Sequence, residues 1–208
     1  MDSKTFPTKG NLIAAKNTVK LSRQGYDLLD RKRNILIREL MALMEKAEKL
    51  QERINKAFVR VYDDLKSANI SMGVSKVEAM ARAVPLENGV TIKTRSVMGV
   101  EIPRVSIKDT EDEPPFGLYS MTTSLDAAYK SFNEVKMLSL KLAETETAAY
   151  RLAVNIKKTQ KRANALKNIT IPRYEKLISD ITSSLEEKER EEFTRLKVIK
   201  AQTIKKKR

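Results

Sequence analysis

A regular alternation of three- and four-residue steps between apolar side chains runs through the N-terminal part of the chain. Between Asn11 and Lys66 no proline occurs, and Gly25 is the sole glycine. An apolar repeat of this spacing specifies a left-handed coiled coil, because it keeps one stripe facing a partner helix. We therefore predict a helix from about Asn11 to Lys66, with Thr8 as its N-cap. The stripe consists of Leu12, Ala15, Val19, Ser22, Tyr26, Leu29, Arg33, Leu36, Leu40, Leu43, Ala47, Leu50, Ile54, Ala57 and Val61.

A second stripe with the same spacing begins near Leu118 and continues almost to the C-terminus. Pro172 lies within it, and a proline inside a helix removes one hydrogen bond and usually bends the axis. Because apolar spacing resumes at Tyr174, we predict a bend at this point and not an end. The stripe consists of Leu118, Met121, Leu125, Ala128, Phe132, Val135, Ser139, Leu142, Glu146, Ala149, Ala153 and Ile156, and less regularly of Ala163, Leu166, Thr170, Tyr174, Leu177, Ile181 and Leu185.

Two long helices that fold back on each other through a short intervening segment run antiparallel. If Leu65 lies beside the start of the second helix, Thr8 falls opposite Ile178. Residues 181–208 then have no partner in this chain, although they contain apolar side chains. Such a helix normally packs against something else, and we expect another protein in that place.

The predicted fold class is therefore mainly α: a long antiparallel two-helix coiled coil with a small head that contains a short β-hairpin. Its domains are the N-terminal helix in residues 1–68, the head in residues 69–117, and the C-terminal helix with an unpaired extension in residues 118–208. The head holds four of the six glycines and four of the six prolines. β-Branched residues alternate around Gly99, which predicts two short strands joined by a tight turn, with Pro103 at an edge. The head is also predicted to contain a short helix at Ser75–Ala83 and an exposed acidic linker at Asp109–Pro115.

Positive charge is concentrated toward the two ends of the chain. The net charge is +14, to which residues 1–70 contribute +6, residues 71–117 contribute −1 and residues 118–208 contribute +9. A basic helix pair can bind nucleic acid, a membrane surface or an acidic protein. The basic clusters lack the aromatic interleaving of single-strand binders, so a surface that faces a protein is as good an interpretation. These clusters are Lys157, Lys158, Lys161, Arg162 and Lys167, and Lys205–Arg208.

The chain contains neither cysteine nor histidine. This absence removes the usual zinc ligands, the commonest general base and the Ser-His and Cys-His pairs of nucleophilic catalysis. No segment approaches the roughly 20 apolar residues that span a bilayer, and the N-terminus lacks the apolar core of a signal peptide. We therefore expect a cytoplasmic protein that is not an enzyme, without a catalytic, cofactor-binding or metal site of its own.

Two charged residues, Arg33 and Glu146, fall on the apolar stripes. A buried charge can determine register and partner. A long arginine side chain can also reach from a seam into solvent, and we favour that interpretation for Arg33. The carboxylates of Glu186–Glu192 are interleaved with basic residues at a spacing typical of a solvated helix face, and this interpretation is favoured over acid-base chemistry.

Specific residues resemble the D subunit of the V-type and archaeal-type rotary ATPases. In the N-terminal helix these are Pro7–Leu12 and Gly25–Arg33. In the C-terminal helix they are Arg162–Leu166, Pro172–Glu175 and Leu185–Lys197. The combination of N-A-L, P-R-Y-E and E-R-E-E-F-x-R-L-K is specific, and the similarity covers nearly the whole chain. The length is closer to that of bacterial and archaeal members than to that of eukaryotic ones.

The resemblance implies that the chain is a central rotor shaft. It would transmit torque between a hexamer of catalytic and nucleotide-binding subunits, A and B, and a membrane ring that translocates protons or sodium ions. Its other implied partners are the small F subunit of the rotor and a funnel-shaped subunit above the ring. It would bind no nucleotide, and it would lie peripheral to the membrane with its unpaired helix deepest in the hexamer. The candidate contacts with the stator are the basic residues Lys9, Lys16, Arg173, Lys176, Lys188, Arg190, Arg195 and Lys197.

Two other classes of function remain open on the residues alone. One is a basic coiled-coil protein that binds nucleic acid or holds other chains together. It predicts binding that weakens steeply with salt. The other is an enzyme that uses carboxylates or lysines only, which predicts activity from the purified chain.

Overall fold

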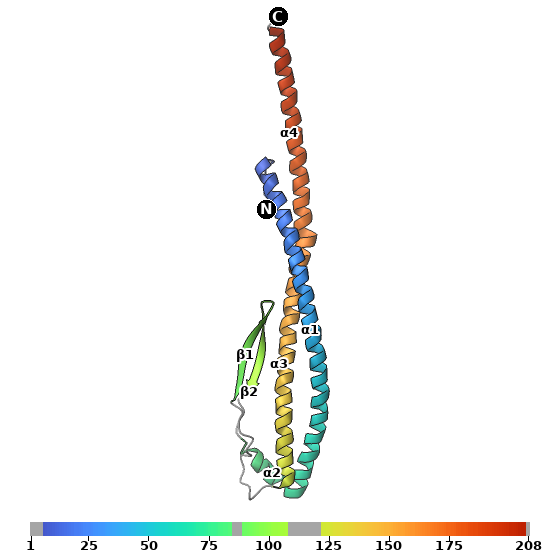
Figure 1. Ribbon diagram of the computed structural model, residues 1–208, viewed down its shortest axis with the longest axis vertical. Coiled ribbons are helices and arrows are strands. Elements are labelled where there is room, and N and C mark those ends of the chain that lie inside the picture. Colours follow the sequence, from blue (N-terminus) through green and yellow to red (C-terminus); the bar gives the residue numbers. More distant parts are fainter. Residues whose placement is uncertain (1–5, 85–88, 108–121, 207–208) are drawn as a thin grey trace. The chain divides into compact units, whose positions relative to one another are not determined.

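The computed structural model describes residues 6–84, 89–107 and 122–206 (Figure 1). The predicted fold class is confirmed, because long helices and one antiparallel hairpin make up these ranges. Leu118, Met121 and the predicted linker Asp109–Pro115 lie outside the described residues. No helix in the described ranges is both long and apolar enough to cross a membrane. The elements are α1 (Lys9–Met72), α2 (Val74–Ala81), β1 (Val90–Val97), β2 (Val100–Ile107), α3 (Thr123–Ala165), the π-helical turn η2 (Leu166–Thr170) and α4 (Ile171–Lys206).

Helix α1 begins as the sequence predicts, with Thr8 as its cap. The Asn11 N–H donates to Thr8 Oγ1 at 3.2 Å, and the Leu12 N–H donates to the Thr8 carbonyl at 3.0 Å. These bonds satisfy donors that the first turn of a helix otherwise leaves free. The helix ends before Gly73, whose φ of 84° lies in the left-handed region that favours glycine at this position. Helix α1 is thus longer than the predicted Asn11–Lys66 at both ends.

The chain divides into two compact parts. The terminal part comprises Met1–Arg33 and Lys157–Arg208, and the hairpin part comprises Asn34–Ile156. In the terminal part, Lys9 pairs with Glu189 at 3.2 Å and Arg23 with Glu175 at 2.6 Å. From the first pair to the second, the residue number increases along α1 and decreases along α4. The two helices therefore run antiparallel, which confirms the prediction.

The predicted register of this pairing is wrong. It places Thr8 opposite Ile178, whereas the structure places the adjacent Lys9 against Glu189, about three helical turns further along. The prediction that residues 181–208 lack a partner is therefore also wrong at its start, because Ile181 is buried with 3% of its surface exposed. The prediction set the turn at Leu65, whereas α1 continues to Met72, and Ala68 packs with Leu125 while Leu65 lies around the same core.

The hairpin part contains two small cores. In the first, Leu36 of α1, Val100 of β2 and Leu152 of α3 are buried against one another. In the second, Ala68 and Leu125 pack with Val77 of α2, the short helix that the sequence predicts at Ser75–Ala83. The half-buried residues around the two cores are Leu40, Leu43, Ile102 and Ile156, and Leu65, Met72 and Met80.

The buried face of α3 lies one residue away from the predicted stripe over part of its length. Phe132 is 39% exposed, and Glu146 and Ala153 are exposed. The buried positions are instead Thr145, Ala148 and Leu152. This is a correction to the predicted stripe. It has a packing reason, because Leu152 fills the space between Leu36 and Val100, which the smaller Ala153 would leave open.

Ser139 of the predicted stripe is exposed as well, and the other predicted seam residues in the described ranges are buried or half-buried. The buried ones are Ala15, Val19, Leu36, Leu50, Ile54, Val61, Leu125, Ala128, Val135, Ala163 and Ile181. The half-buried ones are Leu12, Ser22, Tyr26, Leu29, Arg33, Leu40, Leu43, Ala47, Ala57, Leu142, Ala149, Ile156, Leu166, Thr170, Tyr174, Leu177 and Leu185.

The π-helical turn η2 lies where the spacing of the second stripe changes. From Leu166 to Thr170 and from Thr170 to Tyr174 the stripe takes two four-residue steps in succession, one residue more than the alternation allows. In η2 the Ile171 N–H bonds to the Leu166 carbonyl, five residues back, so the wider turn holds the additional residue. The helix then continues through Pro172, which confirms that this proline does not end it.

Strands β1 and β2 are joined by the two residues Met98 and Gly99. Both have positive φ, 50° and 76°, which is the geometry of the type I′ turn that two-residue hairpins favour. Val97 and Val100 flank the turn as partners, and the register continues to Val90 and Ile107. The predicted pair of strands is confirmed.

The register determines which backbone groups of β2 point away from β1. Because pairs alternate along an antiparallel ladder, the N–H and C=O of residues 101, 103 and 105 point to the outer edge. Two of these positions bond to α3: the Val105 N–H donates to Glu144 at 3.2 Å, and Arg151 donates to the Glu101 carbonyl at 3.1 Å. Pro103 stands between them, where its missing N–H breaks no ladder bond, so its predicted place at an edge is confirmed.

Replacing Gly99 by alanine is expected to lower the free energy of unfolding by about 1 kcal/mol, because a Cβ is disfavoured at positive φ. Nothing lies within 4 Å of the added Cβ, so the cost is conformational and not steric. Gly10→Ala is the matched control, since that site in α1 is equally open and alanine favours a helix. Urea titration followed by circular dichroism measures both variants, and equal stabilities would contradict the turn assignment.

Candidate functional site on the terminal helix

The end of α4 exposes an unusual amount of apolar surface. Every side chain described from Glu186 to Thr203 is exposed. Among them Phe193 is 70% exposed and Leu196 is 65% exposed. Large apolar side chains grouped on a surface mark contacts with other proteins. Val198 and Ile199 belong to the same group, at 51% and 57%.

These apolar side chains are not confined to one face, although Phe193, Leu196 and Ile199 follow one another in three-residue steps. A helix turns about 100° per residue, so Phe193 and Leu196 point to one side of α4 and Val198 to the opposite side. A helix that lies in a groove or pairs with one partner shows its apolar residues on one face only. The distribution instead fits a helix that other chains surround.

The basic residues of the same segment are spread in the same way. Lys188 and Arg195 are seven residues apart, about two turns, and therefore share one face. Arg190 and Lys197 share another face, on the opposite side of the helix by the same geometry. All four side chains are exposed. The positive charge of this segment therefore points in several directions.

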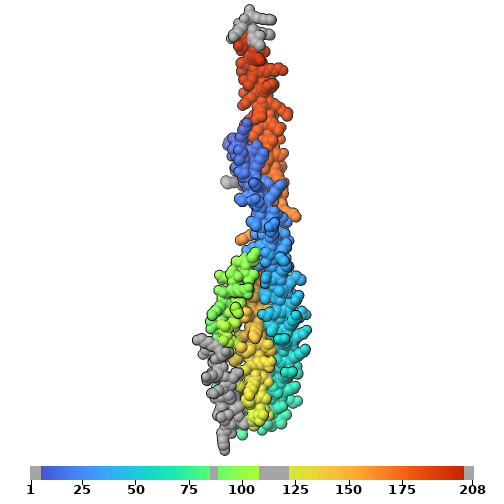
Figure 2. All heavy atoms as spheres, in the orientation of Figure 1, coloured from blue at the N-terminus to red at the C-terminus, as the bar shows by residue number. Residues whose placement is uncertain are grey.

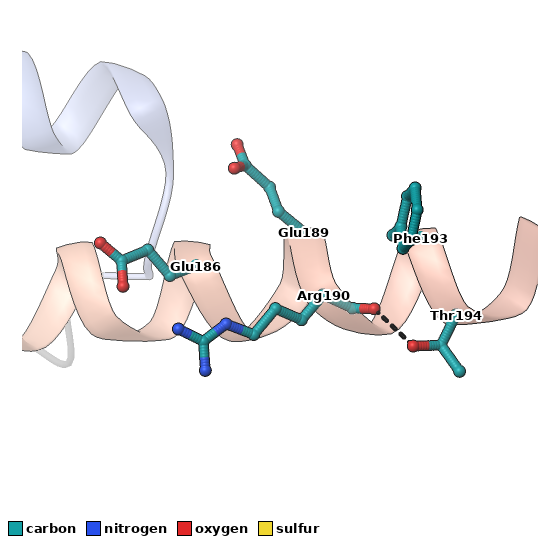
Figure 3. A pocket seen from close by; sticks show the side chains of 5 residues that line it. All are labelled: Glu186, Glu189, Arg190, Phe193 and Thr194. Atoms are coloured by element: carbon teal, nitrogen blue, oxygen red, sulfur yellow. Dashed lines mark hydrogen bonds between the residues drawn. The ribbon is translucent and has the colours of Figure 1, made fainter.

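Two shallow depressions lie between side chains of this segment. The first is lined by Glu186, Glu189, Arg190, Phe193 and Thr194 (Figure 3). Figure 3 shows Glu189 and Phe193 projecting on one side of α4, while Thr194 Oγ1 donates to the Arg190 carbonyl at 2.9 Å. The second continues along the helix to Val198 and Ile199. Both are shallow hollows between side chains of one helix, because all of their lining residues belong to α4.

The ion pairs of this region hold the surface together weakly. Lys9 and Glu189 are 80% and 64% exposed, and Arg195 pairs with Glu191 at 3.8 Å within α4. Exposed pairs of this kind contribute little to stability, because water screens them and the side chains lose freedom. Their charges therefore remain available to a partner at small cost.

The candidate stator contacts all lie in the terminal part. Lys9 and Lys16 are on α1, whereas Arg173 and Lys176 are on the paired stretch of α4, and all four are exposed. The structure brings Lys9 to α4 through Glu189. It places Lys188, Arg190, Arg195 and Lys197 along the exposed end.

The stretches that carry the family resemblance meet across the helix pair. A Cβ added to Gly25 would lie 3.7 Å from Leu166 Cδ1, and Lys167 Nζ lies 5.7 Å from the centre of the Tyr26 ring. The Arg23–Glu175 pair lies in the same region. These residues therefore share one packing surface next to η2, although they are far apart in the sequence.

Arg33 does not simply reach into solvent, as the sequence interpretation favoured. Its guanidinium pairs with Asp30 at 2.6 Å and donates to Gln160 Oε1 at 2.7 Å on the returning helix. Only 26% of its side chain is exposed. The position of Asp30 three residues earlier is a signal for this bond in the sequence, whereas Gln160 is brought to it only by the fold.

Comparison with known proteins gives a consistent result. The sequence model of the ATP synthase D subunit family matches residues 11–201. The D subunit of the V-type ATP synthase of Thermotoga neapolitana is 45% identical over 93% of this chain and 96% of its own length. The D subunit of the A-type ATP synthase of Pyrococcus horikoshii is 35% identical over 95% of this chain and 94% of its own length. The corresponding A-type protein of Methanobrevibacter smithii is 36% identical over 97% and 88%. The similarity therefore extends over both long helices and the hairpin.

Proposed function

This chain belongs to the family of ATP synthase D subunits, and we propose that it is the central-stalk rotor subunit of a V-type or A-type rotary ATPase. In this role it transmits torque between a hexamer of A and B subunits and a membrane ring that translocates ions. It does no chemistry itself, and it lies peripheral to the membrane within the complex.

The observation that carries this proposal is the exposed end of α4. Both apolar and basic side chains point to opposite sides of this helix, which suits a shaft enclosed by a ring of subunits. A rotor also has to move past its surroundings. Charge contacts act over longer distances than interlocked apolar ones, so the basic side chains can keep the shaft centred while it turns.

The paired helices supply the stiffness that torque transmission requires. In the terminal part, α4 is joined to α1 by the Arg23–Glu175 pair, and the end of α3 is joined to α1 by the bond from Arg33 to Gln160. In the hairpin part, α3 is joined to α1 through the core of Leu36 and Leu152. Twisting one helix therefore strains its partner as well.

The hairpin part offers a surface for the remaining rotor partners. On α1, Met41 and Met44 are 60% and 59% exposed, and Val59 and Tyr62 are 64% and 60% exposed. Phe58 and Tyr62 stack with their ring centres 6.0 Å apart. We assign this part to the end that holds the small F subunit and the funnel-shaped subunit above the ring, in accordance with the family resemblance.

Co-purification tests the proposed function directly. The tagged chain is expressed with the A, B and F subunits, and the mass of the complex is measured. We expect one copy of the chain per hexamer. A chain that does not join the hexamer, and that binds nucleic acid with a steep salt dependence, would instead support the nucleic-acid-binding alternative.

Reversing the charges on the exposed end is expected to slow ATP-driven rotation several-fold. The variant changes Lys188, Arg190, Arg195 and Lys197 to glutamate, which replaces attraction to acidic surroundings by repulsion. The matched control exchanges lysine and arginine at the same four positions and keeps every charge. Rotation is followed by a bead attached to the assembled rotor. Equal rates for both variants would show that the charges of α4 do not guide the shaft.

A further inference from the structure

The hairpin carries a cluster of like charges that its own structure does not balance. Lys93 on β1 lies directly opposite Arg104 on β2, and Arg95 is the next cation on the same face. All three side chains are exposed. Like charges directly opposite each other destabilise a strand pair. Within residues 6–84, 89–107 and 122–206, no ion pair involves any of the three.

Within the part of the chain that the structure describes, the outer edge of β1 pairs with no other strand. The outer edge of β2 is bonded to α3 through Val105 and Glu101. By the same register, the N–H and C=O groups of Ile92, Thr94 and Ser96 on β1 point away from β2. No hydrogen bond from another described residue reaches these groups. Figure 1 shows β1 on the side of the hairpin away from α3, Figure 2 shows the hairpin at the surface, and Ile92 is 68% exposed.

The two observations together select the kind of partner. An open strand edge presents donors and acceptors in alternation, which another extended peptide chain matches. A phosphate backbone has acceptors and no matching donors, so it cannot complete this edge. In an added strand, the residues opposite Lys93 and Arg95 lie on the same face as these cations. Carboxylates at those alternate positions would balance the charge cluster.

We propose that the outer edge of β1 binds an extended segment of a partner protein that carries Asp or Glu at alternate positions. The segment adds a third strand to the hairpin, with its carboxylates facing Lys93 and Arg95. Arg104 lies behind Lys93 on the same face and adds to the attraction. The inference rests on the hairpin alone and does not depend on the rotor function.

A peptide experiment on the full-length chain tests the chemistry. The probe is a fluorescent peptide as long as β1 with alternating valine and glutamate, and binding is measured by anisotropy. We expect this peptide to bind and its valine–lysine counterpart not to bind. Two N-methylated versions of the peptide test the backbone pairing, because only alternate amides of an added strand face β1. Methyl groups on the amides that face β1 should abolish binding, and methyl groups on the amides that point away should not. No binding of the glutamate peptide would overturn the proposal and leave Lys93 and Arg95 as protection against edge-to-edge association.

Substitutions locate the site. Lys93→Glu combined with Arg95→Glu should weaken binding about tenfold, since each cross-strand charge pair contributes modestly. The matched control, Lys49→Glu with Lys56→Glu, reverses two exposed lysines on α1 and should leave the affinity unchanged. Thr94→Pro removes one outward N–H and mirrors Pro103 directly opposite, so it should abolish binding where Thr94→Ala does not. Equal affinities for all these variants would overturn the proposal.

Cross-linking identifies the natural partner. The chain has no cysteine, so Ser96→Cys gives a single site for a benzophenone label in the assembled complex. The proposal predicts a cross-link to an acidic, extended segment of a neighbouring subunit, and this cross-link should disappear with the Lys93 and Arg95 reversals. A cross-link to a second copy of this chain, or to the acidic run that follows β2 in the sequence, would overturn it.

Discussion

Replacing Leu36 by alanine will lower the free energy of unfolding by about 3 kcal/mol. Leu36 has no exposed surface, and it packs against Val100 of the hairpin and Leu152 of α3 at the same time. Removing its side chain leaves a cavity between three elements that cannot all close around it. A urea titration followed by circular dichroism measures the change.

The control uses the same substitution on the same helix. Leu28→Ala removes a leucine that is 66% exposed, and it should change the free energy of unfolding by less than about 0.5 kcal/mol. The difference in helix propensity between leucine and alanine is the same at both sites. The difference in stability between the two variants therefore measures the contribution of core packing. If both variants lose equal stability, the core of Leu36, Val100 and Leu152 does not hold the hairpin part together.

Removing residues 190–208 is expected to uncouple ATP hydrolysis from rotation in the assembled complex and to leave the fold of the chain intact. Among the residues that the structure describes, Glu189 is the last one of α4 with an ion pair to α1, and the side chains described beyond it are exposed. A truncation at residue 181 would be less informative, because Ile181 is buried and its loss would damage the helix pair. Rotation is measured with a bead on the rotor, and the fold by thermal unfolding of the isolated chain.

A full-length variant distinguishes the effect of losing the apolar side chains from the effect of shortening the helix. Changing Phe193, Leu196, Val198 and Ile199 to alanine keeps the helix, since alanine has the highest helix propensity, but removes its apolar surface. If these side chains contact the surrounding subunits, this variant should also lose coupling. Full coupling in the truncated chain would contradict the proposal that the exposed end of α4 is the part that the hexamer encloses.

The elements of this fold follow from local patterns in the sequence. The helices follow from the spacing of apolar side chains, and the start of α1 follows from Thr8, whose hydroxyl bonds to the Asn11 N–H. The hairpin turn follows from Gly99, because few residues tolerate its φ of 76°. Each of these features depends on residues that are close together in the chain, so a local pattern is sufficient to predict it.

Contacts between distant residues select how these elements pack together. The repeat predicts a buried stripe on each helix but permits several registers, and the pairs Lys9–Glu189 and Arg23–Glu175 identify the one that α1 and α4 adopt. The contact of Leu152 with Leu36 and Val100 likewise selects the buried face of α3.

The same holds for the candidate site. The sequence predicted an unpaired basic helix end, but only the register shows where that end begins. The charge cluster on the hairpin also needed the fold, because Lys93 and Arg104 become neighbours only when the two strands pair. The physical reason is common to all these cases: neighbouring registers differ little in local energy, and contacts between distant residues decide among them.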